Sequence, residues 1–163
     1  MTPFGVLIEA STTQSASHCF AFEQDFIGTW RCIPLCVRRK LDLCGIKLKL
    51  SHWLELTQNQ RQGLVDWADD PEGLAQLGQH LREVTRGMAD GVVKDLPPAV
   101  DAPWQQQSVL PAEIKSAAAS RGVELTPQKW AAMPELDRFA LCKLVRPGHD
   151  HHNLEAALSE VLG

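Results

Sequence analysis

The stretch that decides the fold is residues 34–65, PLCVRRKLDLCGIKLKLSHWLELTQNQRQGLV, because it aligns without a gap on residues 111–142, PAEIKSAAASRGVELTPQKWAAMPELDRFALC, at an offset of 77. Chance would give about two identities in a window this long, at the background frequencies of common residues. The identical positions are Pro34/Pro111, Gly45/Gly122, Leu48/Leu125, Trp53/Trp130, Arg61/Arg138 and Leu64/Leu141. The alignment therefore indicates an internal duplication, and we call its copies repeat one (34–65) and repeat two (111–142).

The matched residues predict the same order of elements in both repeats. The paired prolines suit the first turn of a helix, and the paired glycines suit the left-handed residue that ends it. Short alternating pieces follow at residues 46–48 and 123–125, and the two pieces could pair across a pseudo-two-fold axis. The next helices carry Trp53 and Trp130, which we expect to anchor the interior because an indole buries a large apolar area. Each repeat therefore reads as helix, sharp turn, short helix, helix.

The remaining segments complete a single all-α domain. Residues 70–87 begin with Asp-Pro, carry leucines spaced by three and four, and end in glycine, which is typical of a helix. Residues 88–110 contain three prolines and a glutamine run, which predicts a long crossing loop. Asn153 suits the cap of a last helix. Residues 1–18 are small and polar and predict a mobile tail, so the domain covers 19–163.

Composition is that of an ordinary globular protein. The chain has 163 residues, of which 44% are hydrophobic and 22% charged. No apolar run approaches the roughly 18 residues of a membrane span, and no Lys or Arg precedes Arg31 as a secretory signal requires. The five cysteines form no compact framework, which favours free thiols in a reducing compartment. We therefore expect a cytoplasmic protein.

Positive charge is concentrated in one stretch near the N-terminal side. All basic residues of the first fifty lie between Arg31 and Lys49, opposed there only by Asp42. Such a stretch could attract an acidic partner surface, or it could be a solvated helix face. The residues concerned are Arg31, Arg38, Arg39, Lys40, Lys47 and Lys49.

Two groups of residues raise the question of a metal site. Cys32, Cys36 and Cys44 have spacings of one and two helical turns, but no second knuckle follows them, as a tetrahedral zinc site requires. Buried thiols on a helix are the alternative. The second group is the run His149, Asp150, His151 and His152, which could hold a transition metal or simply solvate the loop before the last helix.

The sequence contains no recognisable catalytic motif. Gly-x-Ser-x-Gly, a phosphate-binding glycine loop and His-Glu-x-x-His are all missing from it. We therefore predict a non-enzymatic protein. Arg61 and Arg138 recur eight residues after the matched tryptophans, and we expect them to bind a carboxylate or helix-end carbonyls, with partner binding as the second possibility.

Three stretches together resemble the nitrate-reductase-associated protein family. They are Phe20-Ala21-Phe22-Glu23-Gln24-Asp25-Phe26 with Trp30-Arg31-Cys32-Ile33-Pro34, then residues 37–48 with Trp53, then residues 138–144 with Arg146-Pro147-Gly148-His149. The resemblance spans roughly residues 20 to 160 and implies a small soluble protein that assimilatory nitrate reductase needs to mature or act. It supplies no catalytic residue. The chain departs from the usual pattern at His151-His152.

The resemblance and the charge pattern together predict an accessory protein that binds assimilatory nitrate reductase. The predicted contact residues are Arg31, Arg38, Arg39, Lys40, Lys47, Lys49, Arg146 and His149. We expect no cofactor, no nucleic acid and no membrane as partners, and the sequence leaves the oligomeric state open. The alternative is a protein that handles a metal or cofactor, assisting iron–sulfur or molybdenum cofactor insertion through Cys32, Cys36, Cys44 and His149.

Overall fold

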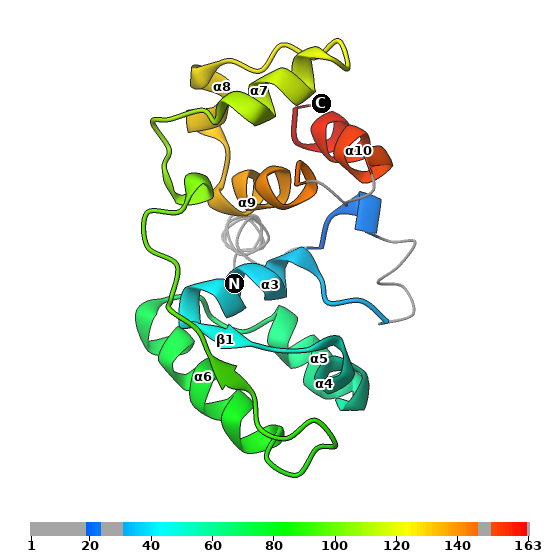
Figure 1. Ribbon diagram of the computed structural model, residues 1–163, viewed down its shortest axis with the longest axis vertical. Coiled ribbons are helices and arrows are strands. Elements are labelled where there is room, and N and C mark those ends of the chain that lie inside the picture. The colour runs from blue at the N-terminus through cyan, green and yellow to red at the C-terminus, as the bar shows by residue number, and fades with distance from the viewer. Residues whose placement is uncertain (1–18, 24–30, 147–150, 163) are drawn as a thin grey trace, which may run out of the picture. The chain divides into compact units, whose positions relative to one another are not determined.

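The computed structural model describes residues 19–23, 31–146 and 151–162 (Figure 1). Within these ranges the chain forms eight α-helices, two short 3-10 helices and one two-stranded sheet, so the predicted helical fold is confirmed. Its contacts divide it into two compact units, each of which holds one repeat. Among the described residues, unit 1 takes Cys19, Glu23 and residues 31–99, and unit 2 takes residues 20–22, 100–146 and 151–162. The predicted tail, residues 1–18, lies outside the described residues.

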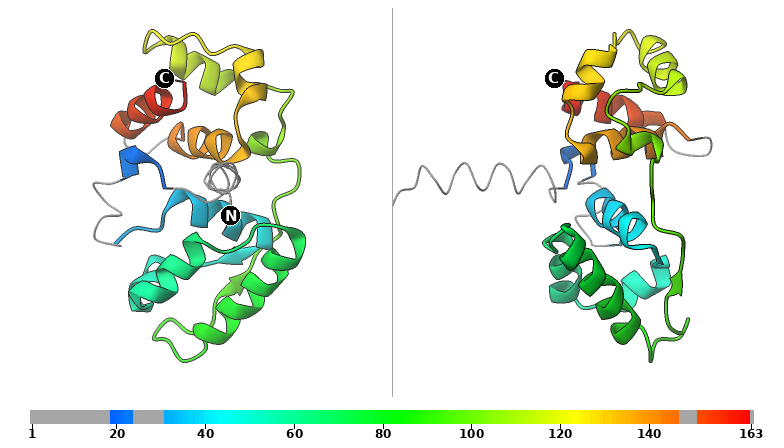
Figure 2. Two further views of the ribbon diagram at one scale, coloured as in Figure 1. Left: turned by 180° about the vertical axis from the view of Figure 1, so that it is seen from behind. Right: turned by 90° about the vertical axis from the view of Figure 1, so that its left-hand side faces the viewer.

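Unit 1 is built around helix α3. Its elements are α3 (Leu35–Cys44), β1 (Ile46–Lys47), α4 (Leu50–Glu55), α5 (Gln58–Val65), α6 (Pro71–Val84) and β2 (Lys94–Asp95). Helix α3 contacts α5, α6 and β1 (Figures 1 and 2). Val37 and Leu41 of α3, Trp53 of α4, and Leu77 and Leu81 of α6 are buried. The amphipathic pattern of α3 and α6 therefore supplies much of the interior of this unit.

The small sheet corrects one prediction. Strand β1 pairs antiparallel with β2, with Ile46 opposite Asp95 and Lys47 opposite Lys94, whereas residues 123–125 form no strand. The expected pairing of 46–48 with 123–125 is therefore wrong. The chain returning from α6 takes the place instead, because Leu96 N donates to Gly45 O at 2.8 Å beside the strand. The segment predicted as a long crossing loop thus contains β2, and also the 3-10 helix η2 (Pro103–Gln105).

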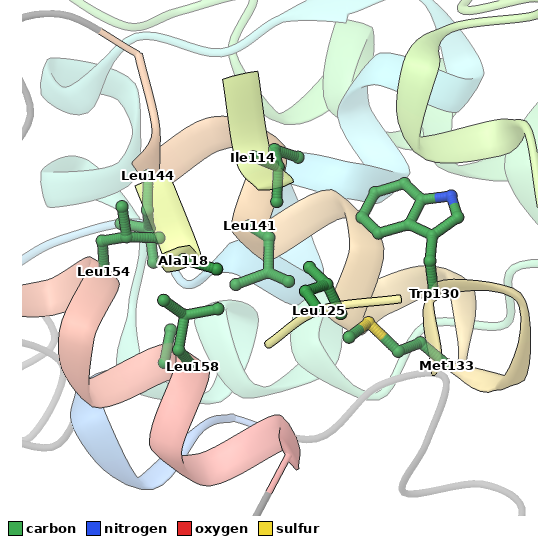
Figure 3. Close-up of a cluster of buried hydrophobic side chains, with 10 residues drawn as sticks. Ile114, Ala118, Leu125, Trp130, Met133, Leu141, Leu144, Leu154 and Leu158 are labelled. Carbon is green, nitrogen blue, oxygen red and sulfur yellow. The ribbon is translucent and has the colours of Figure 1, made fainter. Parts of the chain in front are cut away.

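Unit 2 is built around helix α9. Its helices are α7 (Ala112–Ala119), α8 (Pro127–Ala132), α9 (Glu135–Leu144) and α10 (His151–Leu162), and α9 contacts both α10 and η2. Figure 3 shows its apolar side chains pointing toward one another from all four helices. The buried cluster consists of Ile114, Ala118, Leu125, Trp130, Met133, Leu141, Leu144, Leu154, Ala157 and Leu158.

Unit 2 also includes a short segment from the other end of the sequence. Residues 20–22 belong to it, and Phe22 packs against its apolar cluster while Phe20 is buried. Glu160 of α10 holds the segment, because its two carboxylate oxygens accept from Ala21 N at 2.9 Å and from Phe22 N at 3.1 Å. Residues separated by nearly the whole chain are therefore joined within this unit.

The helices of the two repeats begin at matched positions. Helices α4 and α8 occupy equivalent positions, and α3 and α5 begin where α7 and α9 begin. Gly45 and Gly122 both adopt left-handed backbone, with φ of 72° and 74°, and Trp53 and Trp130 are both fully buried. The matched prolines stand one residue before the first helical residue. The pseudo-two-fold relation between the repeats, and their union in one domain, stay predictions.

Across the described ranges, no helix combines the length and hydrophobicity that crossing a bilayer requires.

Candidate functional site

The structure separates the predicted basic residues into an exposed group and a buried group. Arg31, Arg38, Lys47 and Lys49 of unit 1 are exposed, as is Arg146 of unit 2. Arg39 and Lys40 are buried, and His149 lies outside the described residues. Four of the six basic residues between 31 and 49 are therefore available on the surface of unit 1.

Arg39 and Lys40 serve the interior of unit 1. The Arg39 Nη1 donates to Asp69 Oδ2 at 3.0 Å. The Lys40 side chain is 0% exposed, and its Nζ donates to the carbonyl oxygens of Leu64, at 3.0 Å, and Val65. These carbonyls end helix α5, where no intrahelical donor remains. Burial lowers the pKa of Lys40 because the charged form loses hydration. Both residues stabilise the fold, which corrects their assignment to the partner-facing set.

In the folded chain Lys47 lies beside Lys94, a residue that the sequence analysis did not single out. It lies directly opposite Lys94 in the two-stranded sheet, and both side chains are exposed. Opposite residues of an antiparallel pair point to the same face with Cβ atoms about 5 Å apart, so like charges there repel. Lys49 follows β1 by two residues and is also exposed. We call Lys47, Lys49 and Lys94 the basic surface.

Two exposed leucines adjoin the basic surface. Leu50 is 48% exposed and Leu54 is 44% exposed, and they lie one turn apart on α4, the helix that follows Lys49. Repeat two has Pro127 and Ala131 at the equivalent positions. The fold of the repeat therefore does not require a leucine at either position.

The two lysines that repeat one contributes to the basic surface also have no basic counterpart in repeat two. Glu124 and Thr126 stand in repeat two where repeat one has Lys47 and Lys49. Since the helices around these positions are the same in both repeats, the lysines are not needed to form them. The exposed lysines and leucines of residues 47–54 thus have no counterpart in repeat two, as expected for residues that bind another molecule.

The cysteines of the metal-site alternative do not converge on an ion site. Among residues 19–23, 31–146 and 151–162, no three or more His, Cys, Asp or Glu side chains are grouped so as to hold a metal. Cys36 is fully buried and Cys32 and Cys44 are half-buried. Burial raises the pKa of Cys44 to about 11, which disfavours the thiolate that binds metals. His149, the fourth candidate ligand, lies outside the described residues.

The matched arginines bind the ends of the preceding short helices. Arg61 donates through Nε to Trp53 O at 3.0 Å and through Nη2 to Leu54 O at 2.9 Å. Arg138 donates through Nη1 to Met133 O, which ends α8, and through Nε to Trp104 O at 3.0 Å. The prediction that these guanidinium groups bind helix-end carbonyls is confirmed.

Comparison with known proteins gives one match. The family model of conserved nitrate reductase-associated proteins matches residues 19–161, which includes both repeats and the basic surface. No curated protein matches the chain significantly. No solved structure does so either. The extent of the family match shows that the chain belongs to the family of conserved nitrate reductase-associated proteins.

Proposed function

We propose that this chain is a non-enzymatic accessory protein that binds assimilatory nitrate reductase and supports its maturation or activity. The description of the family, nitrate reductase-associated, supports this choice of partner. We choose the contact surface because Lys47 lies opposite Lys94 in the sheet and both side chains are exposed. The basic surface and the two adjoining leucines form the proposed contact.

Two physical effects support this assignment. Like charges directly opposite each other destabilise a sheet, and an acidic partner surface would relieve that repulsion on binding. Opposite charge also steers encounter and sets orientation more than it adds affinity. Leu50 and Leu54 would then provide apolar area for the centre of the interface, where charged residues are usually depleted.

A charge-reversal experiment tests the surface. Lys47→Glu with Lys94→Glu should weaken binding to the purified reductase about tenfold or more, because both contacts then become repulsive. The matched control is Lys115→Glu with Lys129→Glu, which makes the same change in net charge at exposed lysines of unit 2. Binding is measured by titration calorimetry at low and at physiological salt. Equal effects of the two pairs, or no effect of either, would disprove the assignment.

A second experiment tests the accessory role. The reductase is produced with and without this chain, and its specific activity and molybdenum and iron contents are compared. We expect both activity and cofactor content per reductase molecule to be restored by the wild-type chain, less well by the Lys47/Lys94 variant, and fully by the control variant. A reductase that is equally active without the chain would contradict the proposal.

The alternative function, metal or cofactor handling by the cysteines, predicts a different result. Elemental analysis of the purified, tag-free chain would then find stoichiometric metal that is lost on replacing Cys32, Cys36 or Cys44 by serine.

A further inference from the structure

Two cysteines of unit 1 form a thiol pair. The side chains of Cys19 and Cys36 are hydrogen-bonded to each other, although they are far apart in sequence. Cys36 is the second residue of α3 and is fully buried, whereas Cys19 is half-buried. One thiol of the pair can therefore be reached from solvent, and the other is enclosed behind it.

The surroundings make the two thiols chemically unequal. The hydrogen bond from Cys36 lowers the pKa of Cys19, and the same bond, together with burial, raises the pKa of Cys36. Lys40 lies one turn along α3 from Cys36 and lowers the pKa of both thiols, whereas Glu23 raises both and Asp66 raises that of Cys19. A lowered pKa favours formation of the thiolate that attacks in thiol–disulfide exchange, and a second thiol in contact with it can close the disulfide.

Comparison of the repeats shows that Cys36 and Lys40 are not needed to form helix α3. In repeat two the positions of Cys36 and Lys40 are occupied by Glu113 and Ala117, and α7 forms there as α3 does. Glu23, in addition, is fully buried and accepts from Leu35 N at 2.9 Å, which fixes Glu23 at the start of α3. The fold thus keeps the two sulfur atoms together in unit 1.

We propose that Cys19 and Cys36 form a redox-active dithiol, which a small-molecule disulfide such as oxidised glutathione converts to an intramolecular disulfide. This activity is additional to reductase binding and does not depend on it.

The reaction proceeds in two exchange steps. The Cys19 thiolate attacks one sulfur of the incoming disulfide, whose S–S bond breaks, and the released thiolate takes up a proton. Cys36 then loses its proton to solvent, and its sulfur attacks Cys19 Sγ in the mixed disulfide and expels the second small thiol. Two electrons and two protons pass in total from the cysteine pair to the disulfide, which leaves as two thiols.

The test begins from the Cys32→Ser protein. Trypsin then places Cys19 alone in the peptide that ends at Arg31, because no Lys or Arg precedes it, and Cys36 alone in residues 32–38. After incubation with oxidised glutathione we expect these two peptides to be cross-linked, the intact mass to fall by about two mass units, and dithiothreitol to reverse both changes. No reaction, a stable glutathione adduct without ring closure, or a cross-link to Cys44 or Cys142 would each overturn the proposal.

Substitutions distinguish the roles of the two sulfurs. Cys36→Ser retains a hydroxyl donor beside Cys19 and should stop at the glutathione adduct on Cys19. Cys19→Ser should slow the reaction of the chain with oxidised glutathione about tenfold or more, because it removes the attacking thiolate. The wild-type chain, which retains Cys32, is the matched control and should form the same cross-link as Cys32→Ser. Formation of an adduct at Cys36 in the Cys19→Ser protein at the wild-type rate would contradict the proposed order.

Discussion

The backbone amide of Leu96 donates to the carbonyl oxygen of Gly45 at 2.8 Å, and the carbonyl oxygen of Leu96 lies too close to Gly45 to leave room for a Cβ there. Gly45 therefore meets two demands at once, a left-handed backbone and a close approach of the returning chain. Gly122, its equivalent in repeat two, has the same backbone angle but nothing within 4 Å of its Cβ position.

The two glycines should consequently respond differently to alanine. Gly122→Ala should cost about 1 kcal/mol, because only the left-handed backbone is strained. Gly45→Ala should cost about 3 kcal/mol or more, since the sheet must also separate from Leu96. Urea denaturation followed by circular dichroism measures both. Equal losses of stability in the two variants would show that the contact with Leu96 adds nothing to the cost of Gly45→Ala.

The matched arginines predict a second asymmetry. Arg138 is buried and binds carbonyls from two separate segments, whereas Arg61 is half-buried and binds only the end of α4. Arg138→Met should cost about 3 kcal/mol, because buried carbonyl oxygens lose their donors, and Arg61→Met about 1 kcal/mol. The free energy of unfolding of each variant tests this order. A larger loss at Arg61 would contradict the role assigned to burial.

The repulsion between Lys47 and Lys94 should lower the stability of the chain. Replacing Lys94 by Glu converts a repulsive cross-strand pair with Lys47 into an attractive one, which should stabilise the isolated chain by about 0.5 kcal/mol. The same variant should bind the reductase more weakly. Lys115→Glu, at the exposed position equivalent to Arg38, serves as the control and should leave the thermal midpoint nearly unchanged. A Lys94→Glu protein that melts lower than wild type would argue against repulsion at this pair.

The half-buried thiols predict how stability changes in alkali. Burial raises the pKa of Cys44 and of Cys142 to about 11, above the value of 9.0 for an ordinary thiol. Between these values the unfolded chain loses protons that the folded chain retains, so the stabilising effect of each thiol is complete below pH 9 and is lost as pH rises toward 11. Cys44→Ala and Cys142→Ala should each flatten the fall in the free energy of unfolding over that range. Curves parallel to wild type would contradict the assigned shifts.

The helices and turns could be predicted because their signals are local. Proline before the first turn, glycine in left-handed backbone and an inward tryptophan act within a few residues, and they act alike in both repeats. The sheet partner of β1 could not be predicted, because two-residue strands carry no periodicity and their pairing depends on where α6 returns the chain. Lys94 was missed for this reason.

The buried charges could be anticipated only in part. Lys40 lies four residues after Cys36 and three after Val37, so helical spacing places it on the apolar face of α3. That spacing was a signal of burial. The acceptors at the end of α5, and the contact of Cys36 with Cys19, come from distant segments and are visible only in the folded unit.

The hold of Glu160 on Ala21 and Phe22 has a consequence for the nascent chain. Ala21 and Phe22 are translated 139 and 138 residues ahead of Glu160, whose carboxylate accepts from their backbone amides. The two amides lack this acceptor until Glu160 has been synthesised, and by then every residue of unit 1 has been translated. The segment synthesised early is therefore completed late, and unit 2 cannot form its full set of contacts before α10 has been synthesised.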